Sequence, residues 1–325
     1  MAGGRPRGLP KAMPEALPDE APGAGSQAAK ATKREADAAE AAAPAKRRAR
    51  AAARDEGGGG EAAAAGELSL ADRAGAPDLG DDAPVMSTPR LTEGYRGLRA
   101  LPAATLTFLR QLKEHNDRDW FNAHKKEYEA ARDSVLELFK GVAQHLERID
   151  AELGPQDPKA CMFRIYRDIR FSNDHTPYKT CLSGAMARHG RKSPHACYYI
   201  HIEPGKSFIG GGMWMPEAAV LRQLREAIAQ GAGAEIRQCV NRPEFKRHFG
   251  ATPLFHEHDD RLKTAPKGFA KDHPFVDLLQ LKSFTVGRKL SDDLLTSPAL
   301  LETIVAAFAE MMPFNQLLNS LANLT

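Results

Sequence analysis

The chain has 325 residues, of which 42% are hydrophobic and 27% are charged, and its formal net charge is +3 at pH 7. This composition is typical of a soluble protein, and the length suffices for one large domain or two modest ones. The sequence excludes a membrane-spanning helix and an ordinary secretory signal, because no stretch approaches eighteen apolar residues and the N-terminus lacks an apolar core.

Residues 1–100 are dominated by Ala, Gly, Pro, Arg and Glu and contain very few aromatic or β-branched residues. Such a segment cannot bury enough apolar surface to offset its chain entropy, so we predict a disordered tail. From residue 101 onward Phe, Leu, Ile, Tyr and Trp recur at regular spacing. We therefore predict one folded domain over residues 101–325.

Two basic clusters lie in the tail, at residues 33–34 and 46–50. Their spacing is that of a two-part nuclear import signal, so residues 33–50 predict an import carrier as a partner. The alternatives are an organelle transit peptide and an Ala/Arg-rich tail whose basic clusters have no function. Acidic residues near the N-terminus count against the transit peptide. The four cysteines are scattered without a CxxC pair. They indicate a reducing intracellular compartment, nuclear if the tail acts as a signal and cytoplasmic otherwise.

Apolar periodicity of three and four predicts the first helices, over residues 103–114 and 120–149. The period then changes to two, which predicts strands, and short turns between them favour antiparallel pairing. Helical patterns return in the last third of the chain. The expected strands are 162–170, 182–188, 197–203 and 206–214, and the later helices are 218–229, 234–240, a turn within 275–287 ahead of a strand, a helix from 297 that stops before Pro313, and a short one over 317–321. These elements predict the α+β class, with a central, mostly antiparallel sheet flanked by helices.

Positive charge is concentrated in residues 159–192, which hold eight Lys and Arg side chains against two Asp. Guanidinium groups that lie close together repel one another and lose hydrating water, so their charge must be compensated by a nearby anion. Arginine presents a planar donor fork that matches a carboxylate or a phosphate. We predict an anion-receptive site for a small anionic or phosphate-bearing ligand, and its candidate residues are Arg164, Arg167, Arg170, Tyr178 and Lys179.

An unbroken strand over 162–170 would place Asp168 on the same face as Arg164 and Arg170, and would turn Arg167 toward the core. The alternative to an external anion is therefore a structural network in which Asp168 holds the neighbouring guanidinium groups. Asp168 could also act as a base or as a metal ligand. The loop over residues 173–179 would fold Tyr178 and Lys179 over the strand face, or would simply connect two strands.

His201 and Glu203 lie two residues apart on one predicted strand face, a spacing compatible with an acid–base pair or with a divalent metal. Asp168, His201 and Glu203 are thus the candidate catalytic residues. A second His- and Asp-rich stretch, residues 256–260, does not match a zinc motif and fixes no third ligand. Residues 210–212 are three glycines that favour tight packing over nucleotide binding, because no GxxxxGK[ST] or GxGxxG motif is present.

Residues from about Thr105 to Leu321 resemble the family catalogued as domain of unknown function 2461. The resemblance implies the fold and the position of a site, but it implies no reaction. Its pattern leads us to expect a basic residue near Asp174, so His175 would weaken or pH-tune an anion contact. The residues that carry the resemblance are Asn116 to Phe121, Lys125, Tyr128, Phe163 to Ile165, Arg167, Asp168, Arg170 to Ser172, Pro177 to Lys179, Tyr199, Ile202, Gly211, Gly212, Trp214, Pro216 and Leu281 to Phe284.

Three hypotheses follow from these residues. The first is an enzyme that acts on a phosphate- or carboxylate-bearing substrate. The second is a non-catalytic module for nucleic acid or a phosphorylated partner, which requires exposed aromatic side chains beside the cations, with Tyr166, Phe171 and Tyr178 as candidates. The third is a scaffold whose arginines are salt-bridged internally.

Overall fold

The computed structural model describes residues 91, 95–170, 173–251 and 261–324. Contacts divide the chain into residues 1–60 and 61–325, and every described residue belongs to the second unit. The predicted disordered tail, its import signal and the stretch 256–260 lie outside the described residues.

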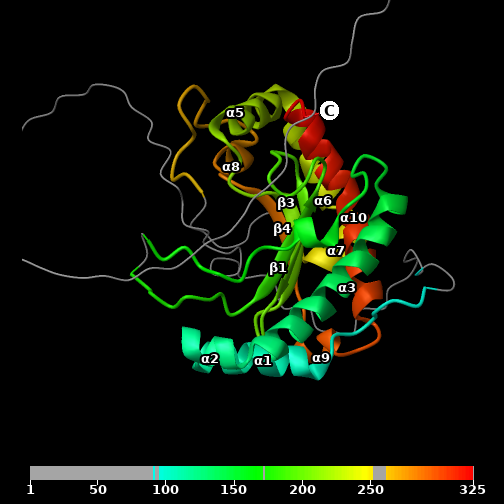
Figure 1. Cartoon of the computed structure of the whole chain (residues 1–325). Coiled ribbons are helices and arrows are strands. Elements are labelled where there is room, and N and C mark those ends of the chain that lie inside the picture. The colour runs from blue at the N-terminus through cyan, green and yellow to red at the C-terminus, as the bar shows by residue number, and fades with distance from the viewer. Residues whose placement is uncertain (1–90, 92–94, 171–172, 252–260, 325) are drawn as a thin grey trace, which may run out of the picture. The chain divides into compact units, whose positions relative to one another are not determined.

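The described chain is α+β, as predicted (Figure 1). Four strands form one sheet in the order β1-β2-β3-β4, and every neighbouring pair is antiparallel. Short turns join β1 to β2 and β2 to β3, whereas several helices separate β3 from β4 along the chain. The strands are β1 (Leu182–Ala187), β2 (Cys197–Ile202), β3 (Phe208–Met213) and β4 (Phe284–Lys289).

The helices pack mainly against one face of this sheet, and α3 and α10 lie side by side there (Figure 1). None of the helices in the described ranges has a stretch long and apolar enough to cross a lipid bilayer. The helices are α1 (Ala103–Glu114), α2 (Arg118–Ala123), α3 (Lys125–Ile149), α4 (Pro158–Cys161), α5 (Ala218–Ala227), a π-helical turn (Ile228–Ala232), α6 (Gly233–Val240), α7 (Pro243–Phe249), α8 (Val276–Leu279), α9 (Asp292–Leu295) and α10 (Leu300–Leu321).

The two faces of β2 have different neighbours because side chains alternate along a strand. Tyr198, Ile200 and Ile202 enter the large core that the sheet forms with the helices. Tyr199 points to the opposite face and joins a small cluster with Ala185 and Phe208. No helical residue belongs to that small cluster. The second face of the sheet is therefore built from strand and loop residues.

Two helix predictions are wrong in their limits. The helix expected over 120–149 is interrupted at His124, whose backbone angles (φ −108°, ψ 26°) are not helical, so α2 and α3 are separate. The helix expected to stop before Pro313 continues through it to Leu321. Met311, Phe314 and Leu318 are fully buried around that proline. Their burial offsets the loss of one backbone hydrogen bond, which costs about 3 kcal/mol in a helix interior.

Three amide side chains of α10 form hydrogen bonds with backbone groups at the beginning of β2 and with a side chain at the end of α3. Asn319 Oδ1 accepts a hydrogen bond from the backbone N–H of Ala196 (2.8 Å), and Asn315 Nδ2 donates to the carbonyl of Cys197 (3.2 Å). Gln316 Nε2 donates to Asp150 Oδ1 at the end of α3 (3.0 Å). The part of α10 beyond Pro313 thus anchors both β2 and α3.

We expect Asp150→Ala to lower the free energy of unfolding by about 3 kcal/mol. Asp150 is 4% exposed and accepts a hydrogen bond from the hydroxyl of Tyr198 (2.8 Å). Burial, together with the charge of Asp150, raises the pKa of Tyr198, so its hydroxyl stays protonated and would lose its partner. Urea denaturation measures the change. Asp133→Ala, at an exposed ion pair with Arg132, is the control and should cost under about 0.5 kcal/mol. Equal losses for the two variants would contradict the prediction.

Candidate functional site

The segment that carries the predicted anion-binding arginines is not a strand. The described residues of this segment, 162–170 and 173–180, form two isolated bridges, Met162 with Gly184 and Tyr166 with Tyr178, and no regular strand. The backbone N–H of Lys179 donates to the carbonyl of Ile165 (2.8 Å), which holds the two arms together. In Figure 1 these arms run out from β1 on the side away from α3. The prediction of an unbroken strand over 162–170 is wrong because pairing ends at Arg167, where the arms become a loop.

Two of the predicted anion-binding arginines have carboxylate partners within this loop. Arg170 donates to both oxygens of Asp168 (2.9 and 2.6 Å), and Arg167 donates to Asp174 and to the hydroxyl of Thr176. The hydrogen bonds from Arg170 lower the pKa of Asp168 to about 2. The backbone N–H of Thr176 and then Arg167 lower the pKa of Asp174 to about 2. Asp168 therefore pairs with Arg170. This is the arrangement expected of an internal structural network, the alternative to a site for an external anion.

The remaining predicted residues of this set do not converge. Arg164 is exposed and forms no ion pair with a carboxylate in the described part of the chain. Tyr178, expected to fold over the strand face, instead buries its ring against Phe121 with the ring centroids 3.9 Å apart. Lys179 Nζ lies 5.5 Å from the centre of the Phe163 ring. Of the five residues, Lys179 is the one that the structure brings close to the second sheet face.

His201 and Glu203 do come together on that face. His201 is fully buried, and its Nε2 lies 3.2 Å from Glu203 Oε2 while its Nδ1 lies 3.2 Å from the hydroxyl of Tyr199. Thr180 Oγ1 donates to the other carboxylate oxygen of Glu203 (3.2 Å). We refer to Thr180, Glu203, His201 and Tyr199 as the relay. Tyr199 and His201 occupy alternate positions of β2, and Glu203 continues the alternation one residue past the end of the strand, so the extended backbone lines up these three side chains.

The charge of Glu203 sets the direction of the hydrogen bonds in the relay. Burial opposes ionisation of Glu203, but its hydrogen bond to His201, the charges of His201 and Lys206, and its hydrogen bond to Thr180 outweigh burial and lower its pKa. An ionised carboxylate only accepts hydrogen bonds, so Nε2 of His201 carries the proton. In the neutral form of the ring Nδ1 is then an acceptor, and the hydroxyl of Tyr199 donates to it. This places a base against the tyrosine proton, with Glu203 holding the imidazole in the required tautomer.

Phe163 lies next to the relay and carries two cations at its ring. Its centroid is 6.3 Å from that of Tyr199. The guanidinium carbon of Arg191 lies 5.1 Å from the Phe163 centroid, and Lys179 contacts the same ring. Cations over an aromatic face are attracted by its quadrupole. Positive charge therefore lies beside Tyr199 even though the loop arginines are paired.

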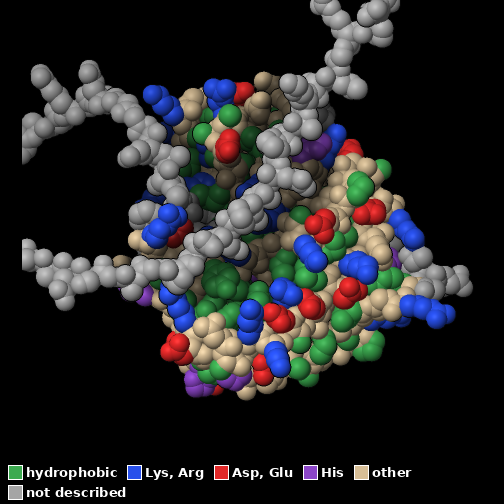
Figure 2. Space-filling view, in the orientation of Figure 1, with side chains coloured by type: hydrophobic (Ala, Val, Ile, Leu, Met, Phe, Trp, Pro, Cys, Tyr) green, Lys and Arg blue, Asp and Glu red, His purple; other side chains and the backbone are tan. Residues whose placement is uncertain are grey.

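The outer face of α3 does not carry a broad basic patch. Figure 2 shows Lys and Arg side chains interspersed with Asp and Glu over this helix. Nucleic-acid-binding surfaces commonly gather basic side chains on one face or along one helix. The charge pattern on this face thus gives no support to the nucleic-acid hypothesis.

A family model, described as a conserved hypothetical protein family, DUF2461, matches residues 104–317. The chain belongs to the DUF2461 family. This confirms the resemblance found in the sequence, with limits that differ by a few residues. No curated protein and no solved structure matches the chain. The loop pairs, the relay and the cations at Phe163 all lie inside the matched DUF2461 range.

The described residues of this DUF2461 domain form no metal centre. No group of three or more His, Cys, Asp or Glu side chains that could hold a metal ion occurs among residues 95–170, 173–251 and 261–324. His201 and Glu203 bind each other, and the stretch 256–260 lies outside the described residues. The divalent metal expected as one alternative at His201 therefore has no supporting ligand set in the described chain.

Sequence reasoning missed two members of the relay and one of the cations of this DUF2461 domain. Tyr199 shares the alternation of His201 and Glu203, so the period of two could have included it. Thr180 joins the relay only through tertiary contact, and no local pattern marks it. Arg191 is one of the eight basic residues of the segment 159–192, but it was not among the predicted anion-binding residues. Its position over Phe163 depends on the turn after β1.

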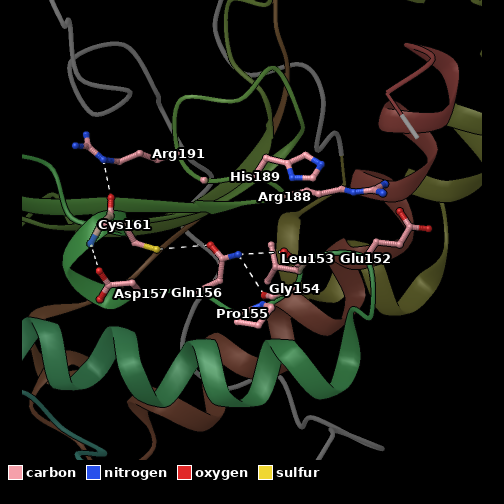
Figure 3. Close-up of a pocket in the computed structure, with 12 residues that line it drawn as sticks. Glu152, Leu153, Gly154, Pro155, Gln156, Asp157, Cys161, Arg188, His189 and Arg191 are labelled. Atoms are coloured by element: carbon pink, nitrogen blue, oxygen red, sulfur yellow. Dashed lines mark hydrogen bonds between the residues drawn. The ribbon is translucent and has the colours of Figure 1, made fainter. Parts of the chain in front are cut away.

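A pocket of about 420 Å³ lies next to this region of the DUF2461 domain (Figure 3). Residues 188–191, in the turn from β1 to β2, form one wall. Residues 152–157, in the connection from α3 to α4, form the other wall, and Cys161 of α4 lies between them. Arg191 is the residue that lines this pocket and also contacts Phe163.

Proposed function

We propose that this DUF2461 domain is an enzyme that moves a proton to or from a phosphate- or carboxylate-bearing substrate. Tyr199 is the group that contacts the substrate, and His201 exchanges its proton. Glu203 positions His201, and Thr180 positions Glu203. The observation that carries the proposal is the buried imidazole of His201, hydrogen-bonded on one nitrogen to Tyr199 and on the other to Glu203.

The arrangement suits general acid–base chemistry more than it suits a structural role. Two apolar side chains of similar shape would fill the same volume without the cost of desolvating a carboxylate and an imidazole. Positioned acid–base groups typically raise a rate by about 10² to 10⁴. Lys179 and Arg191 supply the charge that attracts an anionic substrate to the ring packed on Tyr199.

The test begins with the full chain and a panel of sugar phosphates, nucleotides, organic acids and a single-stranded oligonucleotide. Thermal shift identifies the compounds that bind, and proton NMR then follows the conversion of each of them. Tyr199→Phe removes only the hydroxyl, so we expect turnover to fall at least about 100-fold while the ligand-induced shift in Tm remains. Lys179→Met should instead weaken binding.

Tyr166→Phe is the matched control, because Tyr166 is exposed on the loop arm and lies outside the relay. It should leave turnover unchanged. The proposal is overturned if no compound is converted, or if Tyr199→Phe turns over substrate at the wild-type rate. Binding of the oligonucleotide that weakens steeply with salt and is insensitive to Tyr199→Phe would support the binding-module hypothesis instead.

A further inference from the structure

We propose that the pocket in Figure 3 binds a small zwitterion, a molecule that carries a carboxylate or phosphate at one end and an ammonium group at the other. This inference does not rest on the proposed enzymatic function, although Arg191 is common to both sites. It rests on the charges of the two walls, on the way these walls are held, and on the size of the pocket.

The two walls of the pocket carry opposite charge. Arg188, His189 and Arg191 come from the turn that follows β1. Glu152 and Asp157 come from the connection between α3 and α4. Figure 3 shows the basic side chains along one side of the pocket and the acidic ones along the other. Among the described residues, no ion pair within 4.0 Å joins the two walls.

This separation of charge selects the class of ligand. The two arginines and the two carboxylates cancel in net charge, so the pocket as a whole attracts neither a simple anion nor a simple cation. Asp157 already accepts hydrogen bonds from the backbone N–H groups of Lys159 and Ala160. A singly charged ligand would complement one wall and desolvate Glu152 or Arg188 on the other without giving it a partner, which is costly. A zwitterion complements both walls at once.

The walls are rigid before any ligand binds. Gln156 Nε2 donates to the carbonyls of Leu153 and Gly154 (3.1 and 3.2 Å). Arg191 Nε donates to the carbonyl of Ala160 (2.7 Å), and its terminal nitrogens form no ion pair with a carboxylate among the described residues. A site whose groups are already held loses less conformational entropy on binding.

The backbone of the basic wall is strained. His189 has a φ of 63°, a value that residues other than glycine adopt rarely. Gly190 follows it with a φ of 89°, so the turn itself requires a left-handed backbone. Asparagine or glycine would meet that requirement at lower cost.

The size and floor of the pocket suit a small metabolite. A volume of about 420 Å³ is within the range of small-molecule sites. Burial raises the pKa of Cys161 to about 11, so its thiol is neutral and forms part of an uncharged floor with Leu153 and Pro155.

The test uses the full chain and isothermal titration calorimetry with phosphoethanolamine and the free α-amino acids as probes. Phosphate, ethanolamine, and the des-amino and amide analogues of any amino acid that binds are the single-charge comparisons. We expect at least one zwitterion to bind and each of its single-charge analogues to bind at least about tenfold more weakly, the change expected for one charge-assisted hydrogen bond.

Arg188→Gln and Glu152→Gln should each weaken the zwitterion at least about tenfold, while Lys192→Gln, exposed in the same turn and outside the lining, should not. All three positions are partly or fully exposed, so loss of folding is not expected. The proposal is overturned if no probe binds, if the des-amino analogue binds as tightly as the amino acid, or if binding survives both lining variants. Tyr199→Phe should leave this binding unchanged, which separates it from the enzymatic proposal.

Discussion

Replacing Gly212 by alanine is expected to lower the free energy of unfolding by about 4 kcal/mol or more, enough to unfold a domain of ordinary stability. Gly212 lies in β3 with a φ of +102°, a conformation that residues with a Cβ rarely adopt. An added Cβ would lie 2.0 Å from the carbonyl oxygen of Phe284 in β4. Because that neighbour is backbone in a paired strand, it cannot move without breaking the pairing of β3 with β4. Circular dichroism during urea denaturation measures the loss.

Gly287→Ala provides the matched control in the neighbouring strand. A Cβ at Gly287 would lie 3.4 Å from the carbonyl oxygen of Ile209, close to ordinary van der Waals contact. The expected change is within about 1 kcal/mol of zero, because alanine also reduces the entropy of the unfolded chain. If Gly212→Ala were as stable as Gly287→Ala, the result would contradict the close contact between the backbones of β3 and β4 at Gly212.

The second large effect is a loss of stability between pH 6.5 and pH 4 caused by His248. Burial, followed by the charges of Arg288 and Arg247, lowers the pKa of His248 to about 4. Its Nδ1 accepts a hydrogen bond from Arg288 Nη1 (3.2 Å), which requires the neutral ring. In the unfolded chain His248 titrates near its ordinary pKa of about 6.5.

The sign follows from proton binding. Between these two pKa values the unfolded chain holds a proton that the folded chain does not, so stability falls as the pH falls through this window. Below about pH 4 both states are protonated and no further loss arises from this residue. The difference in pKa corresponds to about 3 kcal/mol. Urea midpoints measured from pH 7.5 to pH 4 would record it.

His248→Gln should remove most of this slope, since glutamine can accept the hydrogen bond from Arg288 at every pH. His115→Gln, at an exposed position, should retain the slope. A wild-type slope in His248→Gln would show that another group is responsible for the acid sensitivity. The same pH series also reports on Glu203, whose lowered pKa stabilises the fold above about pH 4.5 and whose contribution is lost as the pH falls below that value.

The parts of the fold that could be predicted are those whose cause is local. Alternation over 197–203 and the turn after it predicted β2 and its pairing with β3, because both signals lie within a few residues of the element. The break at His124 and the passage of α10 through Pro313 could not be predicted. In the second case the deciding term is burial of Phe314 and Leu318 against strands and helices far away in the sequence.

The candidate site divides in the same way. His201 and Glu203 were predicted to share a strand face, and the extended backbone at the end of β2 brings His201 Nε2 within 3.2 Å of Glu203 Oε2. The partners of Arg167 and Arg170 could not be assigned beforehand, because which carboxylate meets which guanidinium depends on the path of the loop. Two of the five predicted anion-binding side chains, Arg167 and Arg170, are therefore paired with acidic neighbours. Arg191, which lies next to the relay, was not among the five predicted residues.

The amide contacts of α10 have a consequence for how this domain matures on the ribosome. β2 contains Tyr199 and His201, yet the groups at its beginning bond to Asn315 and Asn319, which follow more than 100 residues later in the chain. During synthesis these groups lack their partners until that helix has emerged, so the first residues of β2 stay accessible to chaperones in the interval. Translation pauses or premature stop codons ahead of residue 315 should therefore yield a chain in which β2 is present but not anchored by α10.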